Sequence, residues 1–398
     1  MQLRNYVLIV HVSILSPLTI KYTGMDKRKR AILAVGSVLL IFAALFVVRL
    51  GNLYSSINTQ KETWAQRIPK KKNDFTILMM GYGGTGHEGA YLTDTMMVLR
   101  VDFEKKSTLL VSIPRDVWVE VPTQSGDEFF RKINSVYQMG LFPKNYPDLK
   151  REYKGEQGAG DLIKSVVGNI TGFPIDYYVA IDFSGFKQAI DTLGGVDVYV
   201  KQSFTDPLYP KDGKEKDLCD VDENDMEKLE ELFAIATESP QLAFPCRYET
   251  LHFDTGIQHM DGATALKFVR SRQAPEDGGD FGRAHRQQLF LEAVKDKVLS
   301  VGFIPKVIPL LNDLEGNLKT DIPIDLVNKF LKEVPDAEQY DVTQIVLTTD
   351  NYLQSSYSAD GQYILIAKDG EGVWRSLHKD LTNVIKGISL TPSPKPSL

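Results

Sequence analysis

The spacing of hydrophobic positions changes along this chain, and each pattern predicts a different kind of structure. Near the N-terminus, residues 31–48 form an apolar run that no charged residue interrupts. A run of this length is near the lower limit for a helix that spans a bilayer. Beyond residue 74, short apolar runs bounded by turn residues alternate with stretches in which apolar residues recur every three or four positions. The pattern therefore predicts one membrane-spanning helix followed by a globular domain of the α/β class.

The globular part contains several predicted strands and helices. Residues 102–106 form a turn between two strand patterns, which indicates a hairpin. Further along, a strand, a helix, a Gly194-Gly195 pair and another strand follow one another, and this alternation predicts helices on both faces of a sheet. Strands are predicted at 75–80, 95–101, 108–113, 177–181 and 196–200, and helices at 159–170, 186–193 and 283–299.

Basic residues fix the expected topology of the membrane segment. Lys27, Arg28, Lys29 and Arg30 precede the apolar run directly, so the positive-inside rule places the N-terminus in the cytoplasm and the rest outside. A cleaved signal peptide is the alternative, but the end of the run offers no small-residue cleavage site. A second apolar run at 6–20 suggests either another membrane segment or a true start at Met25, and we favour the latter.

These patterns divide the chain into five parts. The segment at 49–73 has weak periodicity and resembles a stalk, and the last residues are rich in proline and serine, which is typical of a disordered tail. The predicted parts are a cytoplasmic N-terminus at 1–30, a transmembrane signal anchor at 31–48, a stalk at 49–73, an extracellular domain at 74–390 and a disordered tail at 391–398.

Between residues 202 and 248 the regular spacing is lost, and acidic residues dominate from Glu215 to Glu231. This composition predicts a surface insertion. Cys219 and Cys246, the two cysteines of the chain, both lie in it. Because this part is expected outside the membrane, we predict a disulfide between them, although two unpaired thiols stay possible while the distance between their Cα atoms is unknown.

Composition excludes several classes of function. The net charge of −6 argues against nonspecific nucleic-acid binding, which needs a basic face. The histidines show no zinc-site spacing. Gly81 to Gly86 fits the G-x-G-x-x-G pattern, but the next predicted element is a strand, whereas a dinucleotide site needs a helix there. No Gly-Lys-Ser/Thr follows, so a P-loop is excluded as well.

Arginines and carboxylates gather near the predicted ends of strands and helices. Arg115 and Asp116 follow a strand, Arg270 and Arg272 would share a face of an extended segment, and Arg283 and Arg286 would share the first turn of a helix. A guanidinium group can donate two hydrogen bonds to phosphoryl oxygens, so several arginines together suit a pyrophosphate held with a divalent cation. The alternatives are a self-satisfied Arg–Asp pair and solvated surface arginines.

The order and spacing of these motifs resemble the LytR-CpsA-Psr (LCP) family from about residue 75 to about residue 300. The resemblance implies a three-layer αβα fold with a central mixed sheet, preceded by one transmembrane helix. It rests on Leu92-Thr93-Asp94-Thr95-Met96, Leu110 to Asp116, Lys132-Ile133-Asn134, Gly194-Gly195-Val196, Gln258 to Gly262, Val269-Arg270-Ser271-Arg272 and Gly282 to Gln288, together with the glycine loop.

The resemblance also implies an activity. Such proteins move a glycopolymer from an undecaprenyl-pyrophosphate carrier to peptidoglycan or another cell-envelope acceptor, forming a phosphodiester and releasing the lipid phosphate. The implied partners are a polyprenyl-linked glycopolymer donor, a peptidoglycan acceptor and membrane lipid. The rival hypotheses are a polyprenyl-pyrophosphate pyrophosphohydrolase with water as the acceptor, and a non-catalytic envelope regulator that binds polyprenyl phosphate.

Residue roles follow from the same resemblance. The guanidinium groups would grip the pyrophosphate, and Gln287 would make a secondary polar contact. Asp94 would hold Mg²⁺ (or Mn²⁺), with Asp116 acting as ligand, arginine orienter or base. Tyr82 stands where many members of the family carry a second metal-binding aspartate, and Glu88 is a possible replacement. The arginines implied are Arg115, Arg270, Arg272, Arg283 and Arg286.

Overall fold

The computed structural model describes residues 73–388, apart from 88, 300–313, 315, 324, 328 and 330–338. The expected cytoplasmic segment, membrane anchor, stalk up to residue 72 and C-terminal tail lie outside these residues, as do Met25 and Glu88. Within the described part, no helix is both long enough and apolar enough to cross a membrane. All of the described residues belong to a single compact unit.

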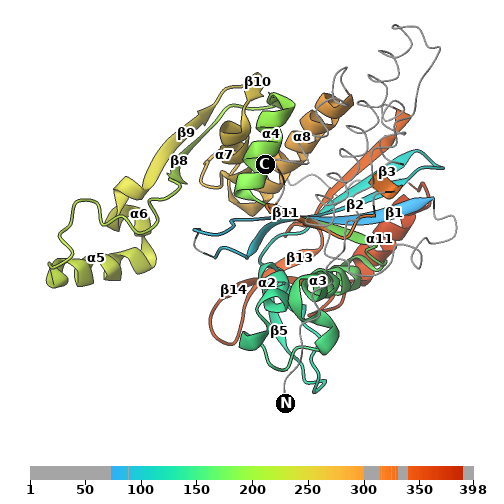
Figure 1. Cartoon of the computed structure of the whole chain (residues 1–398), viewed down its shortest axis with the longest axis horizontal. Coiled ribbons are helices and arrows are strands. Elements are labelled where there is room, and N and C mark those ends of the chain that lie inside the picture. Colours follow the sequence, from blue (N-terminus) through green and yellow to red (C-terminus); the bar gives the residue numbers. More distant parts are fainter. Residues whose placement is uncertain are drawn as a thin grey trace, which may run out of the picture. The chain divides into compact units, whose positions relative to one another are not determined.

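A six-stranded mixed sheet is the centre of this unit (Figure 1). Its two longest strands carry consecutive buried residues, as expected of strands that are covered on both faces. The pairings β1–β2, β2–β3 and β6–β11 are antiparallel, and β1–β6 and β3–β12 are parallel. In spatial order the strands are β11 (Leu318–Thr320), β6 (Tyr177–Asp182), β1 (Asp74–Tyr82), β2 (Thr93–Asp102), β3 (Ser107–Ser112) and β12 (Asp341–Val346).

Helices cover both faces of this sheet, which confirms the predicted α/β class with a central mixed sheet. One hydrophobic core joins Leu78, Val98 and Val111 of the sheet to α2 (Val136–Leu141), α3 (Gly155–Thr171) and α11 (Arg375–Ile385). A second core lies among α4 (Phe183–Leu193), α7 (Gly262–Arg270) and α8 (Gly279–Leu299), which Figure 1 shows on the opposite side of the sheet.

The strand predicted at 196–200 does not extend the central sheet, which corrects the simple strand–helix–strand expectation. It forms β7 (Val196–Val200) and pairs only with β10 (Gly256–Met260). Gly194 and Gly195 both adopt a positive φ, 78° and 75°, which is accessible to glycine without strain. This double turn ends the helix Phe183–Leu193 before β7 begins.

The acidic insertion has regular structure. Strands β8 (Phe204–Pro210) and β9 (Tyr248–Phe253) pair antiparallel, and the chain between them forms α5 (Met226–Glu238) and α6 (Pro240–Ala243). Cys219 and Cys246 are joined by a disulfide with their Cα atoms 5.5 Å apart, as the sequence predicts.

Smaller elements complete the unit. Two further strand pairs are β4 (Trp118–Glu120) with β5 (Phe130–Lys132), and β13 (Leu353–Tyr357) with β14 (Tyr363–Ala367). Short 3₁₀ helices occur at Ile133–Ser135, Pro143–Asn145, Arg151–Tyr153 and Pro245–Arg247.

Candidate functional site

Charged residues identified from the sequence lie at one end of the central sheet, where β1, β3 and β6 end and β2 begins. Tyr82 at the end of β1 lies opposite Thr93 at the start of β2 and opposite Asp182 at the end of β6. Ser112 at the end of β3 pairs with Met97 of β2. Residues that follow β3 therefore emerge beside the first residues of β2, at the edge where α/β sheets commonly bind ligands.

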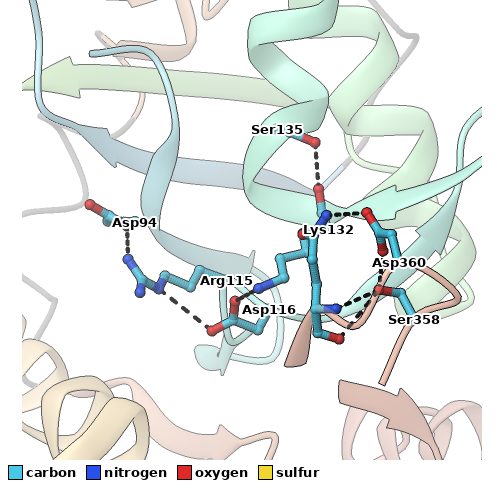
Figure 2. A network of polar contacts seen from close by, with 8 residues as sticks. Asp94, Arg115, Asp116, Lys132, Ser135, Ser358 and Asp360 are labelled. Atoms are coloured by element: carbon cyan, nitrogen blue, oxygen red, sulfur yellow. Dashed lines mark hydrogen bonds and ion pairs between the residues drawn. The ribbon is translucent and has the colours of Figure 1, made fainter. Parts of the chain in front are cut away.

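A chain of ion pairs runs along this edge, and Figure 2 shows it as Asp94, Arg115, Asp116 and Lys132. Arg115 Nη1 donates to Asp94 Oδ1 at 2.7 Å, and its Nε lies 3.6 Å from Asp116 Oδ2. Lys132 Nζ donates to the other oxygen of Asp116 at 2.8 Å. The Asp116 side chain is only 9% exposed and lies between two cations. Asp116 was considered as a metal ligand, as a base or as the residue that orients Arg115, and this geometry favours the last of these roles.

Two neighbouring glutamines of α8 attach that helix to the sheet edge. Gln287 Nε2 donates to Thr95 Oγ1 at 2.8 Å and to the carbonyl of Val269 at 3.2 Å. Gln288 Nε2 donates to Ser112 Oγ at 3.0 Å. Thr95 and Val269 are the immediate neighbours of Asp94 and Arg270, so Gln287 ties together the two halves of the candidate site. The sequence suggested only a secondary contact for this residue.

Arg270 is the last residue of α7, which corrects the idea that it shares an extended face with Arg272. Asp261 caps the start of this helix and accepts from the N–H of Thr264 at 2.8 Å. The Arg270 guanidinium donates to Asp212 Oδ1 at 2.9 Å and to the Tyr209 hydroxyl at 3.1 Å.

Arg272 follows in the connection to α8. Its backbone N–H, the N–H of Gln273 and the hydroxyl of Ser271 all donate to the buried carboxylate of Asp206, at 2.9, 3.1 and 2.7 Å. Asp206 therefore fixes this connection. Sequence reasoning missed Asp206, because it lies in the insertion and two of its three donors in this connection are backbone N–H groups.

Arg286 is a structural arginine in this conformation. Its side chain is 2% exposed and donates to the carbonyls of Ser271 and Asp277 and to the Asp277 carboxylate. Its guanidinium also lies over the Phe204 ring, 4.7 Å from the centroid. Burial lowers the pKa of Arg286. These contacts hold the segment that follows Arg270 in place, instead of presenting the guanidinium to solvent.

The helix that carries Arg283 and Arg286 starts earlier than the sequence suggests. It begins at Gly279, so both arginines lie beyond its first turn, and Arg283 is buried as well. Two of the three glycines that predict a loop, Gly278 and Gly282, serve close packing, and a Cβ on Gly282 would lie 2.2 Å from the carbonyl oxygen of Asp277. The first-turn position expected for these arginines is therefore wrong.

The glycine loop is short and closed, and it is not a dinucleotide site. Gly84 N–H donates to the carbonyl of Ala90 at 2.8 Å, and the chain continues into β2 without a helix, as predicted. Tyr82 points into the core, where its ring stacks on Tyr91 and lies near Tyr137. Burial raises the pKa of Tyr82, so its hydroxyl stays protonated and is no substitute for a carboxylate ligand.

The fit of a hard cation to this site depends on Asp94. Its side chain is 38% exposed, and Arg115 is bonded to one of its oxygens. Across the part of the chain that the structure describes, Asp94 and Asp116 belong to no group of three convergent ligands. Mg²⁺ often binds through one or two carboxylates plus substrate phosphates, and Asp94 fits that mode of binding. The expected replacement ligand, Glu88, is outside the described residues.

The profile described as the LytR_cpsA_psr family matches residues 48–373 of this sequence. The chain belongs to the LytR-CpsA-Psr family. It is 30% identical over 314 residues to the polyisoprenyl-teichoic acid–peptidoglycan teichoic acid transferase TagV of Bacillus subtilis, an alignment that covers 74% of this chain and 65% of TagV. It is 25% identical over 319 residues to TagU of Enterococcus faecalis, which carries the same transferase name, with 77% and 83% covered.

Solved structures agree with the fold of this LytR-CpsA-Psr protein. The crystal structure of B. subtilis TagV matches with a TM-score of 0.52 and 23% identity, over 80% of this chain and 100% of that chain. The crystal structure of gbs0355 from Streptococcus agalactiae matches with a TM-score of 0.53 and 18% identity, over 81% and 91%. At these identities the matches establish the shared fold.

Proposed function

We propose that this protein is a phosphotransferase that moves a glycopolymer from an undecaprenyl-pyrophosphate carrier to peptidoglycan or another cell-envelope acceptor. Family membership supports the proposal, and so do the transferase names of its relatives TagV and TagU. The observation that carries it is the Gln287 bridge, because it places the Asp94–Arg115 pair and Arg270 on two sides of one sheet edge.

The transfer is a displacement at phosphorus. An acceptor hydroxyl oxygen bonds to the phosphorus that carries the glycopolymer and loses its proton to water. The bond from that phosphorus to the bridging oxygen breaks, and the lipid phosphate leaves with the bridging oxygen. Such reactions depend mainly on positioning and on neutralising charge. In the proposal, Arg115 and Arg270 supply that neutralisation. Each is now bonded to a carboxylate, and phosphoryl oxygens would take the place of Asp94 and Asp212.

Other residues position these two arginines. Asp116, which accepts from Lys132, forms an ion pair with the Nε side of Arg115, and Nη1 of Arg115 is directed toward Asp94. Asp206 and Arg286 fix the connection after Arg270. The proposal leaves Arg272 and Arg283 as further sources of positive charge beside the phosphates.

A divalent cation, Mg²⁺ or Mn²⁺, is part of the proposal. Asp94 would hold it with phosphate oxygens and water as the remaining ligands, and bound there it would reduce the negative charge of the diphosphate. The exposed side chain of Asp94 supports this assignment.

Location and partners complete the proposal. The uninterrupted apolar run at 31–48 after four basic residues supports a single-pass membrane protein with its catalytic domain outside. Its donor would then be a polyprenyl-linked glycopolymer in the membrane, and its acceptor would be peptidoglycan.

The test uses the full chain with a lipid-linked glycopolymer, peptidoglycan fragments and Mg²⁺, and mass spectrometry identifies the products. We expect a glycopolymer–peptidoglycan phosphodiester. Arg115→Lys should reduce the rate of transfer at least tenfold, because lysine keeps the positive charge but cannot form the two parallel hydrogen bonds of a guanidinium group. The matched control is Arg100→Lys, since Arg100 also pairs with an aspartate, Asp74, but at the opposite end of β1 and β2.

The outcomes separate the hypotheses. Free glycopolymer phosphate with peptidoglycan left unmodified indicates a pyrophosphohydrolase, and bound but unconverted lipid indicates a binding regulator. Either result would exclude transfer. Equal rates for Arg115→Lys and Arg100→Lys would remove Arg115 from the mechanism.

A further inference from the structure

Three potential metal ligands that are far apart in sequence come together beside Arg270. His87 lies in the loop after β1, and Asp212 and Glu215 follow β8 at the start of the insertion. One ligand atom of each lies within 4.8 Å of the others, and His87 Nδ1 is 3.6 Å from Glu215 Oε1. The sequence predicted no metal site with histidine, since this set exists only when the insertion folds back to the glycine loop.

This cluster adjoins the proposed phosphate site. Asp212 is the carboxylate to which Arg270 donates at 2.9 Å. The rings of His87 and Phe183 lie 5.2 Å apart edge to face, and the Arg270 guanidinium lies 4.1 Å from the centroid of the same Phe183 ring. Arg270 and His87 therefore share one aromatic support, and an ion held by the cluster would lie next to the phosphates that Arg270 binds.

The net charge of the cluster favours the binding of a cation. One arginine and two carboxylates leave it with a net negative charge if His87 is neutral, and a net negative charge opposes phosphate binding beside Arg270. A bound divalent cation would make the net charge of the cluster positive. Ligands about 2.1 Å from a metal lie at most about 4.2 Å apart, so small side-chain rotations would complete the set.

We propose that His87, Asp212 and Glu215 bind a divalent transition-metal ion, Mn²⁺ or Zn²⁺, between the glycine loop and the insertion. One imidazole with two carboxylates suits such ions better than Mg²⁺, which prefers oxygen ligands alone. The site supplies anionic ligands that Tyr82 does not provide. Binding of the ion is independent of the proposed transfer, whereas its assistance to Arg270 rests on that function.

The competing explanation is two ordinary ion pairs, His87 with Glu215 and Arg270 with Asp212, that attach the insertion to the loop without a metal. Pulsed electron paramagnetic resonance of Mn²⁺ added to the full chain distinguishes them, because a directly bound imidazole nitrogen modulates the spin echo. We expect that modulation in the wild type, and its loss in His87→Ala with at least about tenfold weaker Mn²⁺ binding by titration. Zn²⁺ should displace the Mn²⁺ responsible for the signal, and excess Mg²⁺ should not.

The matched control is His259→Ala. His259 Nδ1 also donates to a carboxylate, Asp197 Oδ1 at 2.7 Å, but His259 belongs to no three-ligand group among the described residues. This variant should keep both the modulation and the affinity. Glu215→Gln should weaken binding without removing the nitrogen signal, and thermal unfolding without metal checks that each variant folds.

Several results would overturn the site. They are an absence of nitrogen modulation in the wild type, an unchanged signal in His87→Ala, or equal losses in His87→Ala and His259→Ala. Mn²⁺ bound without a nitrogen signal would assign the ion to carboxylates such as Asp94. If Mn²⁺ binds as proposed but no transfer occurs, the metal site stands and the proposed function is wrong.

Discussion

At the scale of single residues, arginines of the family motifs differ in burial and in the groups they contact. Arg115 is 28% exposed and is paired with the exposed carboxylate of Asp94. Arg286 is 2% exposed and donates to backbone carbonyls. A guanidinium that reaches solvent can exchange a carboxylate for a phosphate, whereas a buried one would leave carbonyls unpaired on exchange. We therefore expect substitutions at Arg115 to affect activity and those at Arg286 to affect folding.

Asp94 provides the sharpest residue-scale prediction. Asp94→Asn should lower transfer at least tenfold and weaken its dependence on Mg²⁺, since a neutral amide binds a hard cation poorly. The rate should be measured across a Mg²⁺ titration. Asp74→Asn is the control, because Asp74 pairs with Arg100 at the other end of the sheet. An unaltered Mg²⁺ dependence in Asp94→Asn would show that the cation binds elsewhere.

His285 predicts how stability responds to acid. Burial, and then repulsion from Lys201, lowers the pKa of His285 below its ordinary value of 6.5. The folded chain therefore binds this proton less readily than the unfolded chain, so its stabilising contribution is complete above pH 6.5 and is lost as the pH falls toward the lowered pKa. His285→Gln should lose less stability between pH 7.5 and pH 5 in urea unfolding than the wild type.

A histidine at the surface is the comparison for this measurement. His252 is exposed and contacts Asp254, so His252→Gln is measured in the same way as a surface substitution of the same kind. If His285→Gln and the wild type lose equal stability on acidification, burial of His285 does not contribute to the acid response.

At the scale of elements, the packing of α3 against β6 depends on a glycine. A Cβ on Gly160 would lie 2.2 Å from the Tyr178 ring, which is itself fully buried. Glycine usually weakens a helix interior, so its presence here reflects the close approach of the two elements. The position of α3 in turn fixes the core beneath the strands that end at the site.

Two glycines of this helix make a matched pair for measurement. Gly160→Ala should destabilise the fold by about 1–3 kcal/mol through overpacking. Gly168→Ala should stabilise it by roughly 0.5–1 kcal/mol, because its Cβ would meet only the Phe173 carbonyl at an ordinary 3.5 Å. Urea unfolding of both variants provides the test, and equal effects would contradict the close packing of Gly160 on Tyr178.

At the scale of the whole molecule, every residue that the structure describes belongs to one compact unit. The candidate site lies entirely within that unit. The uninterrupted apolar run at 31–48 lies outside the described residues, and its sequence predicts attachment to a membrane.

This division predicts that anchoring and folding are separable. Deletion of residues 1–52 should move the protein from the membrane fraction to the soluble fraction, and its thermal midpoint should stay within about 2 °C of that of the full chain. Fractionation with immunoblotting and calorimetry measure the two quantities. A deleted chain that remains in the membrane fraction would contradict the assignment of the anchor to 31–48.

The sequence by itself determined the class of the fold and several of its strands and helices. Apolar periodicity is a local property, and it located β1, β2, β3, α3 and β6 to within a few residues. Local motifs also indicated Arg115, Arg270 and their neighbours, and the expected exterior location predicted the pairing of Cys219 with Cys246.

Only the tertiary structure decided what those side chains contact. Burial separates Arg286 from Arg115, β7 pairs with β10 outside the central sheet, and the Tyr82 side chain points into the core. His87 meets Asp212 and Glu215 across more than a hundred residues of chain. Such contacts depend on which elements pack together, and the spacing of residues within one segment carries no information about that.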